Sequence, residues 1–252
     1  MRKIPVGLAL SLLFDDFNGN CIETLRKISQ TGYQGIESMA ASPIPISEFV
    51  KVLHEFDLAV TSTHVWLREI ENDFSRILEF NQAVKCKYFV VPWLVEMKDP
   101  DEDHFLKMAE RLNKAGKKCK EHGMQLCLHN HGIEFRKFQG RYALDIIYEH
   151  TESGNLQAEL DTYWVKFGGA DPVEYVRKYR DRLPLIHFKD MDAGEGREII
   201  EIGKGILDFN AILEAGNQEF LEWILVEQDS SKLPPFESIK TSFDNLRKMG
   251  IA

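Results

Sequence analysis

The sequence predicts a single-domain α/β fold over residues 1–252, a closed (β/α)8 TIM barrel. Short apolar runs alternate with amphipathic helical stretches along the whole chain, without a linker or a low-complexity segment. Eight such units in a chain of 252 residues leave about 31 residues for each, enough for a strand, a helix and two short loops. At this length, eight parallel strands close into a barrel more often than they form a long open sheet.

The apolar runs are the expected strands, and the amphipathic stretches between them are the expected helices. Most helical stretches follow Asp, Ser, Asn or Pro, and the clearest starts are at Asp171 and Asp208. The strands are expected at residues 4–12, 33–39, 58–65, 88–94, 124–131, 156–164, 183–190 and 223–229. The helices are expected at residues 22–28, 49–56, 74–84, 105–119, 143–148, 173–179, 209–213 and 239–249.

The charge of the chain limits its partners. It has 31 Lys and Arg residues against 40 Asp and Glu residues, a formal net charge of −9. Such an acidic chain lacks the positive field that attracts phosphate backbones, which argues against nucleic acid as a partner. No run approaches the roughly 18 apolar residues of a membrane helix, and residues 1–16 do not read as a signal peptide. We therefore expect a small-molecule partner and neither nucleic acid nor a membrane.

The cysteines indicate the compartment. Cys21, Cys86, Cys119 and Cys127 form no Cys-x-x-Cys pair and are too few to crosslink a chain of this length. We expect reduced, mostly buried thiols and a cytoplasmic location.

Four expected strands in succession end in a polar-x-polar pattern. Residues i and i+2 of a strand point to the same side, and barrel active sites lie at the C-terminal strand ends. A lone strand-end His or Glu is more often a hydrogen-bonded structural residue. Four together would crowd carboxylates that repel one another unless a cation lies between them. The pairs are His129 with His131, Glu159 with Asp161, His187 with Lys189, and Glu227 with Asp229.

These pairs predict a divalent-metal site with His129, Asp161, His187 and Glu227 as ligands. Two imidazoles and two carboxylates suit Mn²⁺, Co²⁺, Zn²⁺ or Fe²⁺ better than Ca²⁺, which prefers six or more oxygens. Ligand types alone do not identify the ion.

Five segments carry a resemblance to a known family: LHNHGIEF (128–135), ELDTYWVKFGGADP (159–172), LIHFKDMD (185–192), EIGKGILDF (201–209) and LVEQD (225–229). Together they resemble the sugar phosphate isomerase/epimerase family of xylose isomerase-like TIM barrels over nearly the whole chain. That family is also similar to inosose dehydratases and hydroxypyruvate isomerases. The resemblance implies one divalent metal, most often Mn²⁺, with Co²⁺, Zn²⁺, Fe²⁺ or Mg²⁺ as alternatives. It is compatible with a homo-oligomer that pairs through the outer helices.

The family pattern matches three predicted ligands and departs at the fourth. It places its strand-six aspartate at Asp161, its strand-seven histidine at His187 and its strand-eight glutamate at Glu227. Many epimerases of this group have a glutamate on strand five, where this sequence has His129. The departure weakens an epimerase mechanism with one glutamate on each face of the substrate. Glu134, five residues later, is the alternative carboxylate, and the choice between His129 and Glu134 stays open.

The predicted reaction is isomerisation or epimerisation of a ketose, keto-sugar or sugar phosphate through a metal-stabilised enediolate. Glu227 is the expected base, and Lys189 is the expected cation beside the developing oxyanion. His131 could protonate a departing oxygen, which keeps a metal-dependent lyase or dehydratase of a keto-sugar or keto-inositol as the alternative. A non-catalytic sugar-binding barrel is the remote alternative.

Further side chains at the strand ends and in the loops are candidate substrate contacts. Aromatic side chains could stack on a sugar ring, and an arginine could meet an anionic group. The Gly203 and Gly205 segment lacks P-loop spacing, which argues against a phosphate site. The resemblance implies that it is the family's turn before the seventh helix. The related three-zinc DNA-repair endonucleases carry a histidine near the position of Trp164, so a nuclease is not expected. The candidate substrate contacts are Glu37, His64, Trp93, Glu134, Trp164 and Arg197.

Overall fold

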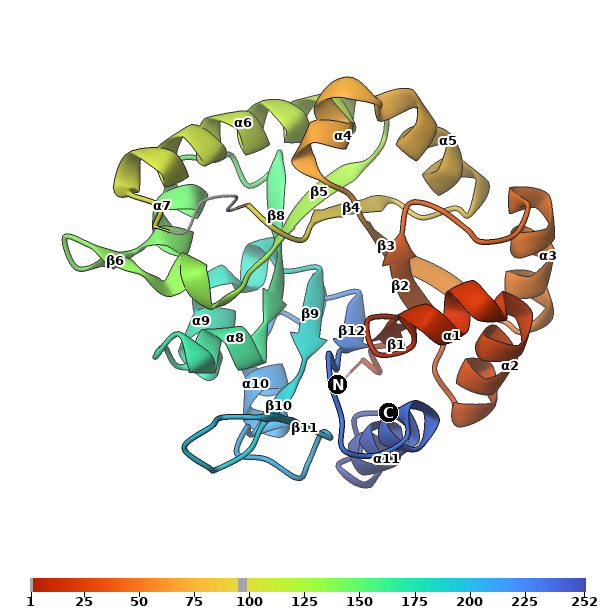
Figure 1. Cartoon of the computed structure of the whole chain (residues 1–252). Coiled ribbons are helices and arrows are strands. Elements are labelled where there is room, and N and C mark those ends of the chain that lie inside the picture. Colours follow the sequence, from red (N-terminus) through yellow and green to blue (C-terminus); the bar gives the residue numbers. More distant parts are fainter. Residues whose placement is uncertain (1, 95–98) are drawn as a thin grey trace.

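The computed structural model describes residues 2–94 and 99–252, and it confirms the closed parallel barrel inside a layer of helices (Figure 1). The strands follow the order β1-β12-β9-β8-β5-β4-β3-β2 around the barrel, and each lies within one of the eight expected runs. They are β1 (Val6–Ala9), β2 (Gly35–Met39), β3 (Ala59–His64), β4 (Tyr88–Val91), β5 (Gln125–His129), β8 (Leu156–Asp161), β9 (Leu185–Phe188) and β12 (Trp223–Val226).

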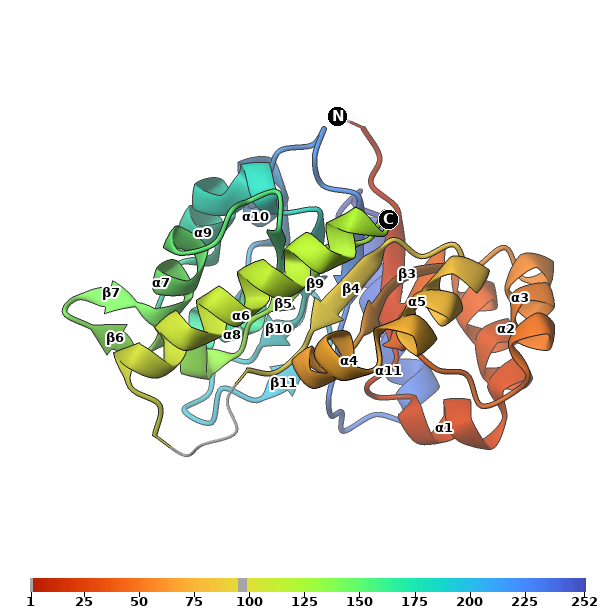
Figure 2. The same cartoon turned by 90° about the horizontal axis from the view of Figure 1, so that it is seen from above.

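The expected helices all form, and the described part of the chain adds three short α-helices after strands. Asp171 and Asp208 cap two helices, since their carboxylates accept the N–H groups of Glu174 at 3.1 Å and Ala211 at 3.0 Å. Figure 2 shows α6 lying along the outside of the barrel. The expected helices are α2 (Cys21–Thr31), α3 (Ile46–Glu55), α5 (Phe74–Ala83), α6 (Glu102–Glu121), α7 (Ala143–Glu149), α9 (Pro172–Tyr179), α10 (Phe209–Ala215) and α11 (Pro235–Lys248), and the added ones are α1 (Phe14–Gly19), α4 (Leu67–Asn72) and α8 (Thr162–Phe167).

The sixth barrel strand is shorter than predicted. The sequence placed residues 156–164 in one strand, but β8 ends at Asp161 and Trp164 lies in α8. The cause is local, because the Asp161 carboxylate accepts the N–H of Trp164 at 3.0 Å and so caps the helix. The Asp161 side chain therefore ends the strand and begins the helix, at the C-terminal end of β8.

The barrel interior changes from apolar to polar along β5 and β9. Tyr88, Val90, Cys127 and Leu185 form a buried apolar cluster. The next residues on the same face of β5 and β9, two positions further along, are His129 and His187. The larger hydrophobic core lies between the barrel and the helices. The apolar filling thus supports a polar layer at the C-terminal ends of the strands.

The buried carboxylate of Asp190 holds the segment at residues 203–207. Asp190 is fully buried and accepts the N–H groups of Gly203 and Gly205 at 2.9 Å each and of Leu207 at 3.2 Å. A Cβ on Gly205 would lie 2.2 Å from the carbonyl oxygen of Met191, so this approach requires glycine. The segment is therefore the turn that the sequence predicts, with its amides bound to Asp190.

Two hairpins extend from the barrel, β10 (Asp190–Met191) with β11 (Ile199–Ile200) and β6 (Lys137–Phe138) with β7 (Arg141–Tyr142).

The thiols also agree with the prediction. Cys21, Cys86, Cys119 and Cys127 are free and buried. Among the described residues, no helix has both the length and the apolar character to cross a bilayer.

Candidate functional site

The C-terminal ends of the strands bring imidazole, carboxylate and ammonium groups to one buried place. β8 contributes two of them, because Glu159 and Asp161 are two residues apart and face the same side. Of the whole set, His64 retains the most exposure, with 19% of its side chain accessible. The set consists of Glu37 from β2, His64 from β3, His129 from β5, Glu159 and Asp161 from β8, His187 from β9, Lys189 directly after β9, and Glu227 directly after β12.

The four predicted metal ligands lie together, and we call His129, Asp161, His187 and Glu227 the outer cluster. One ligand atom of each lies within 4.8 Å of the others. His187 Nδ1 is 3.1 Å from Glu227 Oε2, and His129 Nε2 is 3.9 Å from the same oxygen. Asp161 Oδ2 is buried and has no hydrogen-bond partner in the described part of the chain. A divalent cation fits this donor set, since a buried, unpartnered carboxylate oxygen requires a positive partner.

Lys189 places a permanent positive charge beside the outer cluster. Its Nζ lies 3.2 Å from Glu227 Oε2, 3.7 Å from Asp161 Oδ2 and 2.5 Å from Asp229 Oδ2. Burial alone would lower the pKa of Lys189, but the charges of Glu227 and Asp161 outweigh it and raise that pKa. The side chain is therefore an ammonium group held in place, as a stabiliser of developing negative charge must be.

A second group lies deeper in the barrel, and we call Glu37, His64, Glu159 and His187 the inner cluster. It is deeper because Glu159 precedes Asp161 by two residues on β8. Glu37 Oε1 lies 3.0 Å from His64 Nε2 and 3.2 Å from His187 Nε2. Glu159 Oε2 lies 3.6 Å from His64 Nε2 and 3.3 Å from His187 Nε2.

Charge balance within this layer means that any cation bound there would have to displace protons. Burial alone would lower the pKa of His64, but the charge of Glu37 and the contact with Glu159 raise it to about 10. The pKa of His187 is raised for the same reason against the same opposing burial. Protonated imidazoles thus neutralise the carboxylates. A cation must displace these protons, because only a neutral imidazole binds a metal.

His131 lies among aromatic rings beside the outer cluster. Its ring centroid is 4.5 Å from that of Trp93, 5.3 Å from that of Trp164 and 4.9 Å from that of His129. Burial lowers the pKa of His131 to about 2, so the imidazole is neutral. His131 Nδ1 and Trp164 Nε1 are both buried without a hydrogen-bond partner among the described residues. These two atoms could meet polar groups of a ligand.

Glu134 supports His131. It lies in the 3₁₀ helix η1 (Gly132–Phe135), is 1% exposed, and its Oε2 accepts the backbone N–H of His131 at 2.8 Å. Burial raises the pKa of Glu134 to about 7. Within residues 2–94 and 99–252, two of the three groups able to hold a metal contain His129, and none contains Glu134.

Arg197 makes its contacts with α8. Its Nη1 donates to the carbonyl oxygen of Phe167 at 3.1 Å, and its own carbonyl oxygen accepts the hydroxyl of Tyr163 at 2.7 Å. The predicted contact between Arg197 and an anionic group of the substrate stays a prediction.

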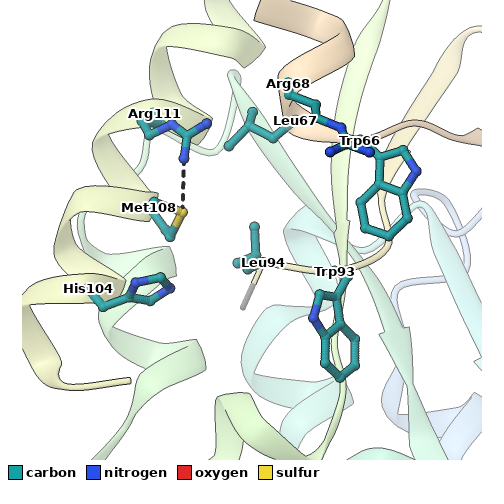
Figure 3. A pocket seen from close by; sticks show the side chains of 8 residues that line it. All are labelled: Trp66, Leu67, Arg68, Trp93, Leu94, His104, Met108 and Arg111. Carbon is teal, nitrogen blue, oxygen red and sulfur yellow. Dashed lines mark hydrogen bonds between the residues drawn. The ribbon is translucent and has the colours of Figure 1, made fainter. Parts of the chain in front are cut away.

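A small hollow of about 90 Å³, open to solvent, lies beside the mouth between α4 and α6 (Figure 3). Two partly exposed indoles flank it, Trp66 (37% exposed) and Trp93 (41% exposed). Since Trp93 also packs on His131, the hollow adjoins the polar layer. Leu67, Leu94 and residues of α6 complete its wall.

The sequence analysis selected Asp161 as a ligand and gave no role to Glu159. The structure brings Glu159 Oε2 within 3.2 Å of His129 Nδ1 and within 3.3 Å of His187 Nε2. It thus contacts both imidazoles of the outer cluster. The signal that could have identified it was already present, because Glu159 shares a strand face with Asp161.

Known proteins resemble this chain in sequence and in fold. A family model described as xylose isomerase-like TIM barrel matches residues 25–249. An inosose dehydratase from Lacticaseibacillus casei is 29% identical over 158 residues, which are 54% of this chain and 51% of that protein. The chain therefore spans about half the length of this curated relative.

Two solved structures share the barrel. A sugar phosphate isomerase/epimerase from Parabacteroides distasonis has a TM-score of 0.84 at 21% identity and covers 98% of this chain and 94% of its own. A protein named IOLI, solved with a bound zinc atom, has a TM-score of 0.77 at 16% identity and covers 97% of each chain. At these identities the likeness shows the fold. The match of the family model over most of the sequence establishes that this chain belongs to the xylose isomerase-like TIM barrel family.

Proposed function

We propose that this protein is a divalent-metal-dependent isomerase or epimerase of a ketose, keto-sugar or sugar phosphate. One observation carries the proposal: His129, Asp161, His187 and Glu227 are buried at the strand ends with ligand atoms within 4.8 Å of one another. The isomerase/epimerase with the same fold and the zinc-bearing neighbour support the choice. The outer cluster would hold Mn²⁺, or alternatively Co²⁺, Zn²⁺, Fe²⁺ or Mg²⁺.

The side chains around the outer cluster could divide the chemistry among them. When bound, the cation would polarise the substrate ketone and acidify the neighbouring C–H. Glu227 is the proposed base that removes this proton, and its return to the neighbouring carbon of the enediolate would complete an isomerisation. An epimerisation would instead need a second group that protonates the same carbon from the opposite face. Lys189 would face the developing oxyanion, because its ammonium group lies 3.2 Å from Glu227. His131 would donate to or accept from a substrate hydroxyl through an imidazole that stays neutral.

The remaining candidate substrate contacts lie either in the inner cluster or among the aromatic rings around His131. Glu37 and His64 belong to the inner cluster, and Trp93 and Trp164 enclose His131. We propose that the indoles contact the apolar face of the sugar ring. We also propose that the protein works in the cytoplasm on a small sugar, without nucleic acid or membrane partners, and that a homo-oligomer would form through the outer helices.

A metal-dependent lyase or dehydratase of a keto-sugar or keto-inositol is the second candidate. The specific observation is His131, whose imidazole lies 4.9 Å from the ring of His129 and could protonate a departing β-oxygen. The inosose dehydratase relative is in line with this branch. A sugar-binding barrel without catalysis is a remote third candidate.

Incubation of the metal-loaded protein with candidate ketoses in D₂O tests these proposals. An isomerase or epimerase leaves solvent deuterium in the recovered sugar, and an eliminating enzyme gives an unsaturated product. E227Q, assayed at a metal concentration that saturates the site, is expected to abolish both signals, and E55Q, a surface change on α3, is the matched control. Full turnover by metal-loaded E227Q would refute the role of Glu227 as the base.

A further inference from the structure

The inner cluster has the composition and shape of a metal site of its own. We propose that Glu37, His64, Glu159 and His187 bind a second divalent cation, a small four-coordinate ion such as Zn²⁺. The inference goes beyond the proposed function, because the inner ion could bind whether or not the outer cluster catalyses a reaction.

Four contacts within the inner cluster have the length expected between neighbouring ligands of a zinc ion, and Glu37, Glu159 and His187 form one of the groups that could hold a metal. Zinc binds His nitrogen and carboxylate oxygen at about 2.0–2.2 Å, so the ligand atoms of a tetrahedral site lie about 3.4 Å apart. The distances from Glu37 Oε1 to His64 Nε2 and His187 Nε2 are 3.0 and 3.2 Å. Those from Glu159 Oε2 to His187 Nε2 and His64 Nε2 are 3.3 and 3.6 Å. Two nitrogens with two carboxylate oxygens suit Zn²⁺ and disfavour Mg²⁺, which keeps several of its waters.

Three of the four ligand atoms lack a hydrogen-bond partner among the described residues, and the fourth, Glu159 Oε2, contacts His129 Nδ1 at 3.2 Å. Glu37 Oε1, His64 Nε2 and His187 Nε2 are buried and form no hydrogen bond with any described residue, although they lie only 3.0–3.2 Å apart. A hydrogen bond requires the N–H to be aligned with its acceptor. Short separations without that alignment are typical of donor atoms placed around an ion. Buried polar atoms without partners are otherwise costly.

His187 belongs to both clusters, and its two ring nitrogens allow it to serve each of them. With Nε2 on the inner ion, Nδ1 keeps its proton and donates to Glu227 Oε2, a contact present at 3.1 Å. A carboxylate that accepts from the far nitrogen is the usual partner of a metal-bound histidine. The outer cluster would then hold its ion through His129, Asp161 and Glu227. The remaining coordination positions stay open for substrate oxygens.

Metal counting on the whole chain tests the inference. The protein is freed of metal with a chelator, equilibrated with Zn²⁺ and analysed for bound zinc by mass spectrometry, with circular dichroism as the check on folding. We expect two ions for the natural protein and for the surface control H54Q, and one ion for E37Q. H64Q is the second inner variant, because His64 is partly exposed and its change disturbs packing least.

D161N distinguishes failure of this inference from failure of the proposed function. We expect D161N to retain the inner ion, with zinc anomalous scattering in its crystals centred between Glu37 and His64. A single ion that D161N loses and that E37Q and H64Q keep would overturn the inner site. A single ion that E37Q loses and D161N keeps would support the inner site and refute the outer ligand set of the proposed function.

Discussion

Glu134 should make the stability of this protein fall as pH rises through the weakly acidic range. Its carboxyl is 1% exposed, and burial raises its pKa from the ordinary 4.5 to about 7. Below pH 4.5 the group is protonated in both the folded and the unfolded chain. Between the two pKa values, the unfolded chain releases this proton and the folded chain keeps it, so the free energy of unfolding decreases. At about 1.4 kcal/mol for each pKa unit, the loss between pH 4.5 and pH 7 is about 3 kcal/mol.

E134Q removes this titration and keeps an oxygen that can accept the N–H of His131. Any constant cost of the buried amide is the same at every pH, so the informative quantity is the difference between variant and natural protein. We expect E134Q to gain about 3 kcal/mol relative to the natural protein between pH 4.5 and pH 7.5. Urea denaturation of both proteins in chelator, at several pH values across this range, measures the difference.

The control is E55Q, which changes an exposed carboxylate on α3. Its difference from the natural protein should stay within about 0.5 kcal/mol across the same range. If the difference between E134Q and the natural protein were also independent of pH, burial would not hold the Glu134 carboxyl protonated, and the reasoning would fail.

Three further predictions concern the metal, the oxyanion and the loop. D161N should weaken binding of the outer ion at least about tenfold, since an amide cannot replace a charged ligand. Equilibrium dialysis with Mn²⁺ measures this affinity. An unchanged affinity would contradict the assignment of Asp161 as a ligand. K189M should lower kcat about 100-fold and change KM little, because the ammonium group acts on charge that develops in the transition state. Steady-state kinetics of the variant and the natural protein measure both constants. A rise in KM with an unchanged kcat would instead assign Lys189 to substrate binding. D190A should lower the free energy of unfolding by about 3 kcal/mol, since the amides of Gly203, Gly205 and Leu207 lose their acceptor. Urea denaturation measures the loss. The comparison variant D208A, which removes only a helix cap, should lose about 1 kcal/mol.

Local patterns along the chain were sufficient to predict the barrel. The eight apolar runs contain the eight strands, and the caps at Asp171 and Asp208 mark true helix starts. The i, i+2 pattern at strand ends also identified His129, Asp161, His187 and Glu227, whose ligand atoms the fold brings together. The prediction of the strands and helices succeeded because it depends on strand and helix periodicity, which a linear sequence displays directly. The role of the four side chains as metal ligands stays a prediction.

The grouping of side chains from distant strands was decided only by tertiary structure. Glu37 on β2 and Glu159 on β8 are far apart in the sequence and lie on strands that are not neighbours, yet both contact His187 Nε2. Their meeting depends on the tilt and stagger of the closed barrel, a property of the whole sheet that no single strand carries. The same holds for the neutral state of His131 and the buried carboxyl of Glu134, since burial comes from surrounding elements. The sequence by itself therefore determined the elements and the strand ends at which polar side chains gather, and closure of the barrel decided which of their atoms meet.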